Sequence, residues 1–369
     1  MSRSIQSCLL ILAMLLALPA FAGTRAIVDA SKRTVNVPER VERSICSGSG
    51  CLRLLTYLQA QSTAVAVDDI ESRKKTFDAR PYALANPQFK SLPIFGEFRG
   101  HDNPELILTL EPQPQVIFKT YASSMGYDPV ELQDKTGIPV VVLNYGNLGA
   151  LRPQLYQSLR TMGEVIGKQQ RAEAVIAFME KQIDDLVQRT ADIPEQQRPS
   201  VFVGGVAFKG PHGYQSTEPG YPPFSFVNAH NLAYTKGITK KELSHSDVSK
   251  EKIVEWNPDY LFLDLSTLQL GDKAGGLFEL RTDPAYRTLT AVREGRVYGL
   301  LPYNWYTQNY GSILANAFFI GKQLYPERFT DVDPAAKADE IYTFLVGKPV
   351  YSDMNGIFRG MAYKPVPVN

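Results

Sequence analysis

Two distant stretches of the chain share one arrangement, in which a short helical pattern is followed by a proline and then by a strand pattern. One stretch reads NPELILTLEPQPQVIF and the other reads SKEKIVEWNPDYLF. The interval from Glu105 to Pro112 equals the interval from Glu251 to Pro258, seven residues in both cases. A repeated arrangement of this kind predicts two related lobes within the chain.

Strand patterns alternate with helical patterns along both halves, which is typical of an α/β fold built on a parallel sheet. The run PVVVL at 139–143 is apolar throughout, as expected for a strand that is buried on both faces. The predicted strands are 40–46, 64–68, 115–119, 139–143, 200–204, 259–264 and 296–300. The predicted helices are 51–58, 104–112, 129–136, 224–233, 249–256, 311–324 and 335–345. We therefore expect two Rossmann-like lobes with a ligand cleft between them.

A long helical pattern separates the two halves. Good helix formers dominate from Arg152 to Arg189, and Pro194 and Pro199 follow. We expect one helix over 152–190 to join an N-terminal lobe at 23–151 to a C-terminal lobe at 199–369.

The first 22 residues have the three parts of a secretory signal peptide. Arg3 precedes an apolar run from Cys8 to Leu18, Pro19 ends this run, and Ala20-Phe21-Ala22 offers a cleavage site. The run is shorter than the roughly 20 residues of a membrane-spanning helix, although an uncleaved membrane anchor is the alternative. Cleavage after Ala22 would release a periplasmic protein that starts at Gly23.

The composition argues against two classes of function. Lys and Arg number 39 against 38 Asp and Glu, which leaves a net charge of +1 and no basic footprint for nucleic acid. The chain has four His and lacks both an HExxH motif and a GxSxG elbow. The sequence thus offers no recognisable zinc-protease or serine-hydrolase site, and we expect no enzymatic activity.

Two cysteines remain after export, in the stretch Cys46-Ser-Gly-Ser-Gly-Cys51. Cysteines this close in an oxidising compartment predict a disulfide. Two free buried thiols and a thiolate metal site are the alternatives, although two ligands alone make a poor metal site.

Several phrases together resemble the helical-backbone class of periplasmic solute-binding proteins, which serve ABC importers of iron–siderophore complexes, haem and cobalamin. The resemblance covers nearly the whole mature chain. The phrases are VPERVERS from Val37, EPQPQVI from Glu111, TGIPVV from Thr136, LRTMGEVIG from Leu159, NPDYL from Asn257 and LTAVREGRVY from Leu289.

This resemblance implies a monomer without an intrinsic cofactor that binds a chelated metal, above all an iron(III)–siderophore complex. The partners would be the permease and the ATPase of an importer. The resemblance also implies that a glutamate on each lobe docks onto the permease, and Glu105 and Glu251 match these positions. Both could instead be acids that merely complement the dipoles of their helices.

The ligand of such a protein lies between the lobes, so loops that follow strands supply the candidate contacts. Each of these residues could instead serve a turn, a solvated loop or the core. The candidates are Ser47 and Ser49; Arg80, Tyr82, Arg99 and His101 in an insert that begins at Arg73; Lys209, His212 and Tyr214; and Tyr303, Trp305 and Tyr306.

The Cys46…Cys51 pair and the loop GPHGY have no obvious counterpart in the better-known siderophore binders. Another metal, another metal complex or a cobalamin-like solute is therefore an alternative ligand, and a metal held directly by His and Tyr is another. A periplasmic metal-dependent enzyme and a sensor that uses the same fold are the alternative functions.

Overall fold

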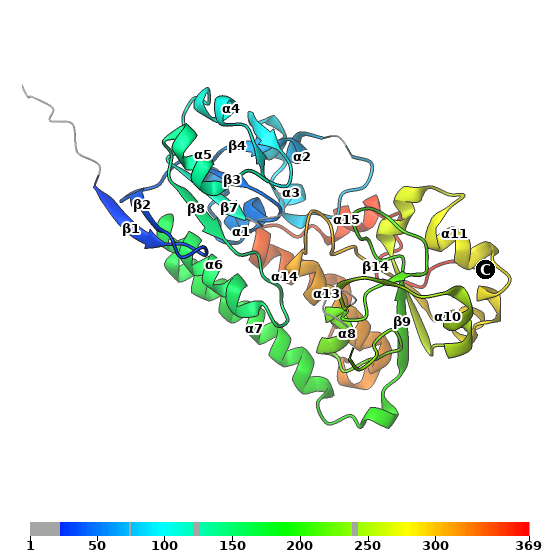
Figure 1. Ribbon diagram of the computed structural model, residues 1–369. Helices are drawn as coiled ribbons and strands as arrows, with labels where there is room; N and C mark the ends of the chain where they lie inside the picture. The colour runs from blue at the N-terminus through cyan, green and yellow to red at the C-terminus, as the bar shows by residue number, and fades with distance from the viewer. Residues whose placement is uncertain (1–22, 74, 121–125, 238–242, 369) are drawn as a thin grey trace, which may run out of the picture.

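The computed structural model describes residues 23–73, 75–120, 126–237 and 243–368, and it shows two α/β lobes side by side (Figure 1). The proposed signal peptide lies outside the described residues. Within the described ranges, no helix combines the length and the apolar character needed to cross a membrane.

The N-terminal lobe is built on a six-stranded sheet with the order β6-β5-β4-β3-β7-β8. The strands pair in parallel except for the β5–β6 pair. The strands are β3 Ser44–Ser47, β4 Ala64–Asp68, β5 Ile94–Glu97, β6 His101–Asp102, β7 Val116–Thr120 and β8 Val140–Leu143, and a separate hairpin joins β1 Thr24–Val28 to β2 Thr34–Pro38. The helices are α1 Cys51–Tyr57, α2 Asp69–Ser72, α3 Pro81–Ala85, α4 Pro104–Leu108 and α5 Pro129–Thr136, with 3-10 turns η1 Gln61–Thr63 and η2 Pro87–Ser91.

The C-terminal lobe contains a parallel four-stranded sheet with the order β11-β9-β13-β14. Its strands are β9 Ser200–Gly204, β11 His230–Asn231, β13 Tyr260–Asp264 and β14 Val297–Leu300, and β10 Ser216–Thr217 pairs with β12 Ser246–Asp247. The helices are α8 Pro222–Phe226, α10 Lys250–Trp256, α11 Gly275–Thr282, α12 Thr290–Arg293, α13 Tyr310–Leu324, α14 Pro334–Val346 and α15 Tyr351–Ile357. The 3-10 turns are η3 Glu195–Gln197, η4 Leu265–Leu270, η5 Tyr286–Thr288 and η6 Pro326–Arg328. The predicted α/β class with two lobes is thus confirmed.

The single helix predicted over 152–190 is wrong, because the segment forms two antiparallel helices. These are α6 Arg152–Val165 and α7 Gln169–Thr190. Gly167 adopts a φ of 70° in the turn between them, and Arg160 pairs with Glu173 across the two helices. Helix α7, which would be about 33 Å long at 1.5 Å per residue, runs from the N-terminal lobe towards the far end of the C-terminal lobe (Figure 1).

Apolar side chains of both lobes share one core in the described part of the chain. Helix α14 contacts both α1 and α3, although it follows the last strand of the C-terminal lobe in sequence. Phe344 of α14 also stacks on Phe178 of α7, with their ring centroids 4.0 Å apart. Because moving the lobes apart would expose this shared core to water, the structure favours small changes in lobe separation.

Candidate ligand-binding cleft

A cavity of about 370 Å³ lies between the two lobes and takes its walls from both. The N-terminal lobe contributes Ser49, Ile70, Arg73, Lys75, Phe98 and Arg99. The C-terminal lobe contributes Ala207, Lys209, Gly210, Gln269, Asn304, Trp305, Tyr306 and Thr307.

The lining residues follow the carboxyl ends of strands in both sheets. Ser49 follows β3, Arg99 follows β5, Lys209 follows β9 and Gln269 follows β13. The Asn304–Thr307 segment follows β14. Parallel strands place their carboxyl ends at one edge of a sheet, and ligands of open α/β sheets bind outside that edge. The two sheets therefore direct loops from many strands into one cleft.

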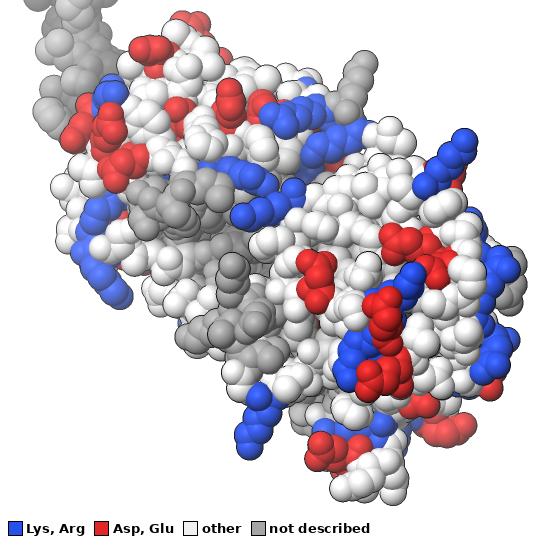
Figure 2. Space-filling view, turned by 45° about the vertical axis from the view of Figure 1, so that its right-hand side comes forward, with Lys and Arg blue, Asp and Glu red and all other residues white. Residues whose placement is uncertain are grey.

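Positive charge dominates the walls of the cleft. Arg73, Lys75, Arg99 and Lys209 all line it, and none of the described lining residues is Asp or Glu. All four cationic residues are exposed, although the surrounding protein partly desolvates the ammonium group of Lys75. Figure 2 shows Lys and Arg side chains gathered where the two lobes meet. A cleft with this lining attracts anions and repels free metal cations.

Two of these cations share one aromatic ring. The guanidinium carbon of Arg73 lies 4.6 Å from the ring centre of Phe98, and that of Arg99 lies 5.0 Å from it. Arg73 also forms an ion pair with Asp69, whereas no ion pair to Arg99 or Lys209 occurs among the described residues. Cation–π contacts leave the N–H donors of Arg99 available to a ligand, whereas Nε and Nη2 of Arg73 donate to Asp69, so Nη1 of Arg73 is the nitrogen left for a ligand.

Strained backbone concentrates at the same place. Ten described non-glycine residues have positive φ, and four of them line the cleft: Arg99 at 65°, Lys209 at 57°, Tyr306 at 49° and Thr307 at 61°. The left-handed region is especially unfavourable for a β-branched residue such as Thr307. Conformations of this kind persist where the surrounding structure imposes them, and they cluster at ligand sites.

Ionisable groups in the cleft wall and behind it have altered pKa values, among them Lys75 and Asp68. Desolvation of its ammonium group, followed by repulsion from Arg80, lowers the pKa of Lys75 to about 8. Burial, followed by repulsion from Glu71, raises the pKa of Asp68 to about 7, although a hydrogen bond from Tyr306 opposes this rise. Asp68 lies at the end of β4, so the Tyr306–Asp68 hydrogen bond joins the two lobes.

Five of the residues proposed from the sequence line the cleft: Ser49, Arg99, Lys209, Trp305 and Tyr306. Lys75, Phe98, Gln269, Asn304 and Thr307 also line the cleft, although none of them is among the residues proposed from the sequence. Gln269, in the 3-10 turn η4, and Thr307 both lie in segments that follow strands, so the rule that proposed the other residues could have found them. Nothing in the sequence pattern marks Phe98 as the partner of two arginines.

Arg80 and Tyr82 do not line the cleft, which corrects the prediction for both. The Arg80 side chain is fully buried, where it forms ion pairs with Glu71 and Asp78. Tyr82 is also buried, and its hydroxyl donates a hydrogen bond of 2.6 Å to Glu71. Both side chains hold the start of α3 in place, because their partners lie in the preceding loop and in α2.

Ser47, Tyr214 and Tyr303 are also buried away from the lining. Ser47 accepts a hydrogen bond of 3.0 Å from the buried ammonium of Lys119. Tyr303 donates a hydrogen bond to the buried carboxyl of Glu218. Tyr214, proposed as a ligand contact, thus lies in the core of the C-terminal lobe together with Tyr221 and Phe224.

The two histidines proposed as ligand contacts lie outside the cleft lining. His101 lines a separate groove of the N-terminal lobe beside Glu105. Nε2 of His212 donates a hydrogen bond of 2.7 Å to the Phe208 carbonyl oxygen. Across the described residues, no three His, Cys, Asp or Glu side chains come together as metal ligands.

Cys46 and Cys51 are free, buried thiols in this structure, which corrects the predicted disulfide in favour of the first alternative. Cys51 Sγ lies 3.4 Å from the Phe118 carbonyl oxygen and donates to it. Burial, followed by the hydrogen bond with Cys51, raises the pKa of the Cys46 thiol well above its usual value. Both thiols therefore pack beneath the loop that carries Ser49.

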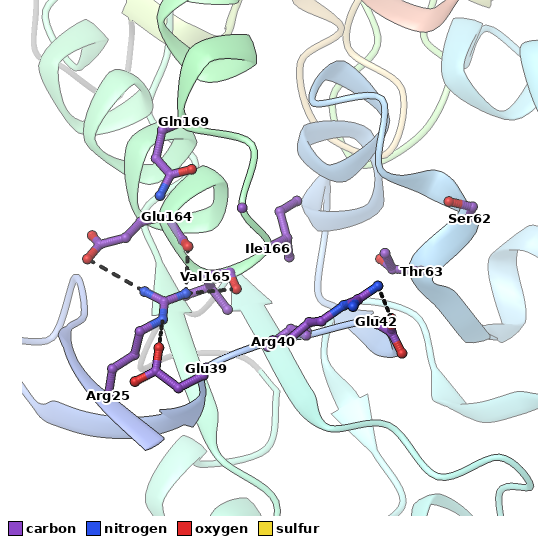
Figure 3. Close-up of a pocket in the computed structure, with 12 residues that line it drawn as sticks. Arg25, Glu39, Arg40, Glu42, Ser62, Thr63, Glu164, Val165, Ile166 and Gln169 are labelled. Atoms are coloured by element: carbon purple, nitrogen blue, oxygen red, sulfur yellow. Dashed lines mark hydrogen bonds and ion pairs between the residues drawn. The ribbon is translucent and has the colours of Figure 1, made fainter. Parts of the chain in front are cut away.

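A larger hollow of about 720 Å³ lies on the outside of the N-terminal lobe (Figure 3). Its charged groups are satisfied by one another, since Arg25 pairs with Glu39 and Glu164, and Arg40 pairs with Glu42. Arg25 also donates to the carbonyl oxygens of Glu164 and Val165 at the end of α6. These contacts give the hollow a structural role in holding the β1–β2 hairpin against α6.

Comparison with known families identifies the class to which this fold belongs. The sequence profile described as "Periplasmic binding protein" matches residues 62–303, which is more than half of the chain. The chain belongs to the periplasmic binding protein family. Members bind solutes and are not enzymes, so this protein is the substrate-binding component of an ABC importer.

Individual relatives agree with this assignment and differ in ligand. The molybdate-binding protein MolA of Haemophilus influenzae is 24% identical over 364 residues, covering 90% of this chain and 94% of MolA. The molybdate-bound MolA structure superposes with a TM-score of 0.65 at 20% identity, over 88% of this chain and 98% of MolA. A periplasmic solute-binding protein of Veillonella parvula reaches 0.69 at 17% identity, over 94% and 100% of the two chains. CeuE of Helicobacter pylori with Ni(II) bound reaches 0.56 at 18% identity, over 88% and 96%.

The buried carboxyl of Glu218 predicts a pH-dependent stability. Burial raises its pKa to about 8, whereas an unfolded glutamate titrates near 4.3. The folded state therefore keeps a proton that the unfolded state loses, and stability falls as pH rises between these values. Relative to the wild type, Glu218→Gln should gain about 1.4 kcal/mol of unfolding free energy per pH unit between pH 5 and 8. Urea unfolding across this range measures the difference.

Glu173→Gln is the matched control, because Glu173 is exposed and Arg160 lowers its pKa. Its stability relative to the wild type should not change between pH 5 and 8. A constant difference between Glu218→Gln and the wild type over the same range would contradict a protonated Glu218.

Proposed function

We propose that this protein captures a small divalent oxyanion, of which molybdate is the best-supported example, in the inter-lobe cleft and delivers it to its importer. The observation that carries the proposal is the lining of Arg73, Lys75, Arg99 and Lys209 without a carboxylate among the described lining residues. We further propose that the protein acts as a monomer in the periplasm, after removal of its signal peptide, and that an ATPase drives the permease.

The chemistry of the cleft suits an oxyanion. Guanidinium groups present a fork of N–H donors that matches pairs of oxygen atoms, and lysines add point charges. Ser49, Asn304 and Thr307 offer uncharged polar groups between the cations. The similarity to MolA over nearly the whole chain supports molybdate within this class.

An anionic iron(III)–siderophore complex is the second candidate, and the extent of the cleft favours it. A further hollow of about 510 Å³ shares Lys75, Gln269 and Trp305 with the cleft, and Phe77, Leu268 and Arg359 also line it. Together the two spaces would accommodate a chelate that carries negative charge and apolar surface. The acid-free lining suits such a complex and disfavours a free cation.

The oxyanion proposal predicts micromolar or tighter binding of molybdate that depends on the cleft cations. Charge-assisted hydrogen bonds contribute about 1.5–3 kcal/mol each, so Arg99→Ala and Lys209→Ala should each weaken binding roughly tenfold or more. Isothermal titration calorimetry measures these affinities. Lys90→Ala removes an exposed cation of η2, outside the cleft lining, and should leave the affinity unchanged.

Mass spectrometry of protein purified from its native periplasm separates the two candidates. Stoichiometric molybdenum without an organic mass agrees with an oxyanion, whereas iron together with an organic mass would replace the oxyanion with a chelate. A wild-type protein that binds neither molybdate nor an anionic ferric chelate would contradict the proposed function.

Binding should also depend on the protonation of Lys75. Since its pKa is lowered to about 8, the ammonium form predominates below pH 8 and is lost above it. An anion favours the charged form, so affinity should fall as pH rises from 7 to 9, with net proton uptake on binding near pH 8. Calorimetry in buffers of different ionisation enthalpy measures the uptake, and Lys75→Arg should abolish both effects. Equal proton uptake by Lys75→Arg and the wild type would rule out this role for Lys75.

Glu105 and Glu251 remain our candidates for docking onto the permease. Each is exposed in the first turn of its helix, α4 or α10, and the side chains of Asn103 and Ser249 cap these helices. Reversing both charges, in Glu105→Lys with Glu251→Lys, should abolish uptake in cells and leave the affinity for ligand unchanged. Uptake at the wild-type rate in the double variant would refute the docking role.

A further inference from the structure

Arg53 is a fully buried arginine of the N-terminal lobe whose guanidinium group reaches into the C-terminal lobe. Its Nη1 donates a hydrogen bond of 3.0 Å to the Gln308 carbonyl oxygen. Its Nη2 donates to the carbonyl oxygens of Trp305 and Tyr306, at 3.2 and 3.1 Å. One side chain of α1 thus binds three backbone carbonyl groups of the segment that forms the cleft wall after β14.

A second group of the N-terminal lobe supports the same segment. The hydroxyl of Tyr145, which follows β8, donates a hydrogen bond of 2.6 Å to the Gln308 carbonyl oxygen, and Arg53 donates to that hydroxyl. Tyr306 in turn donates from its own hydroxyl to Asp68 at the end of β4. A side chain on Gly50 would reach within 2.7 Å of Thr307, so the two lobes also touch at this point.

The supported segment has a backbone conformation that its own residues disfavour. Tyr306 and Thr307 have φ values of 49° and 61°, and the Trp305 amide donates 3.1 Å to the Thr307 carbonyl oxygen across the turn. Left-handed backbone at two successive non-glycine residues requires support from the surroundings. Among the described residues of the N-terminal lobe, Arg53 and Tyr145 are the side chains that bind carbonyl groups of this turn.

We propose that Arg53 is a positioning residue that holds the 304–308 turn in its ligand-binding form only while the lobes are together. Arg53 itself does not line the cleft, and it acts through Asn304, Tyr306 and Thr307, which do. This inference rests on the proposed function of the cleft. When the permease separates the lobes, the fork of hydrogen bonds breaks, the turn relaxes, and the C-terminal wall of the site is lost.

The hydrogen bonds of Arg53 link lobe separation to loss of affinity for the ligand without a large domain movement. A hydrogen bond weakens within about an ångström of added distance, so a small separation suffices to release three carbonyl groups. The shared core limits larger movements, which makes a short-range coupling of this kind useful for release.

The test uses Arg53→Lys in the full mature protein, because lysine keeps the charge and cannot serve three carbonyl groups from one fork. Arg171→Lys is the matched control. Arg171 of α7 likewise donates from its guanidinium to backbone carbonyl oxygens, those of Tyr57 and Phe344, and it does not line the cleft. Tyr145→Phe removes one donor to the turn without any change of charge and provides a second, milder variant.

Two measurements are made on each variant: the dissociation rate of molybdate, and amide hydrogen exchange of residues 303–309 in the ligand-free protein. Arg53→Lys should dissociate molybdate at least tenfold faster and exchange faster across this turn, and Tyr145→Phe should show smaller changes of the same kind. Arg171→Lys should lower the melting temperature without changing either quantity.

Wild-type dissociation and wild-type exchange in Arg53→Lys would overturn the positioning role. Equal changes in Arg171→Lys would also overturn it, because they would indicate a general loss of stability. If the wild type fails to bind molybdate, the proposed ligand is wrong, and the exchange measurement still decides the role of Arg53 because it needs no ligand.

Discussion

Burial of apolar side chains from both lobes in one core is the interaction on which the rest of the structure depends. It sets the distance between the two sheets. The loops that follow the carboxyl ends of their parallel strands line the cleft. Helix α14 follows the C-terminal sheet in sequence and packs on α1 and α3 of the N-terminal lobe, so it contributes to both lobes. With the lobes held in this way, Arg53 can reach the turn after β14, and Tyr306 can reach Asp68.

The cleft concentrates two unfavourable features that a ligand would relieve. Four cations face one space without a carboxylate among its described lining residues, and four of these lining residues have left-handed backbone. Repulsion between the cations is reduced by the ring of Phe98 and by Asp69, and a bound anion would reduce it further. In a preorganised anion receptor, the free-energy cost of bringing cations together and of straining the backbone is met during folding, before the ligand binds. The clustered cations and the left-handed backbone of this cleft fit that description.

The two-lobed α/β fold of this protein could be predicted from its sequence, whereas several side-chain contacts could not. The repeated Glu-to-Pro spacing and the apolar strand runs predict two parallel α/β lobes, and the rule that ligands bind after strands finds Ser49, Arg99 and Lys209. Arg80 and Tyr82 follow no strand directly, and their buried partner Glu71 becomes apparent only in three dimensions. Gly167 ends α6 because a glycine adopts positive φ easily, yet the surrounding helical pattern hides this break. The fork of Arg53 joins residues more than 250 positions apart, which no local pattern can reveal.

The most direct test of the central claim is a crystal structure of the protein with molybdate, recorded at the molybdenum absorption edge. We expect an anomalous peak between the two lobes, within hydrogen-bonding distance of the side chains of Arg99 and Lys209, with the 304–308 turn in the conformation described above. A peak elsewhere, for instance in the hollow beside Arg25, or an empty cleft at saturating molybdate, would contradict an oxyanion site between the lobes.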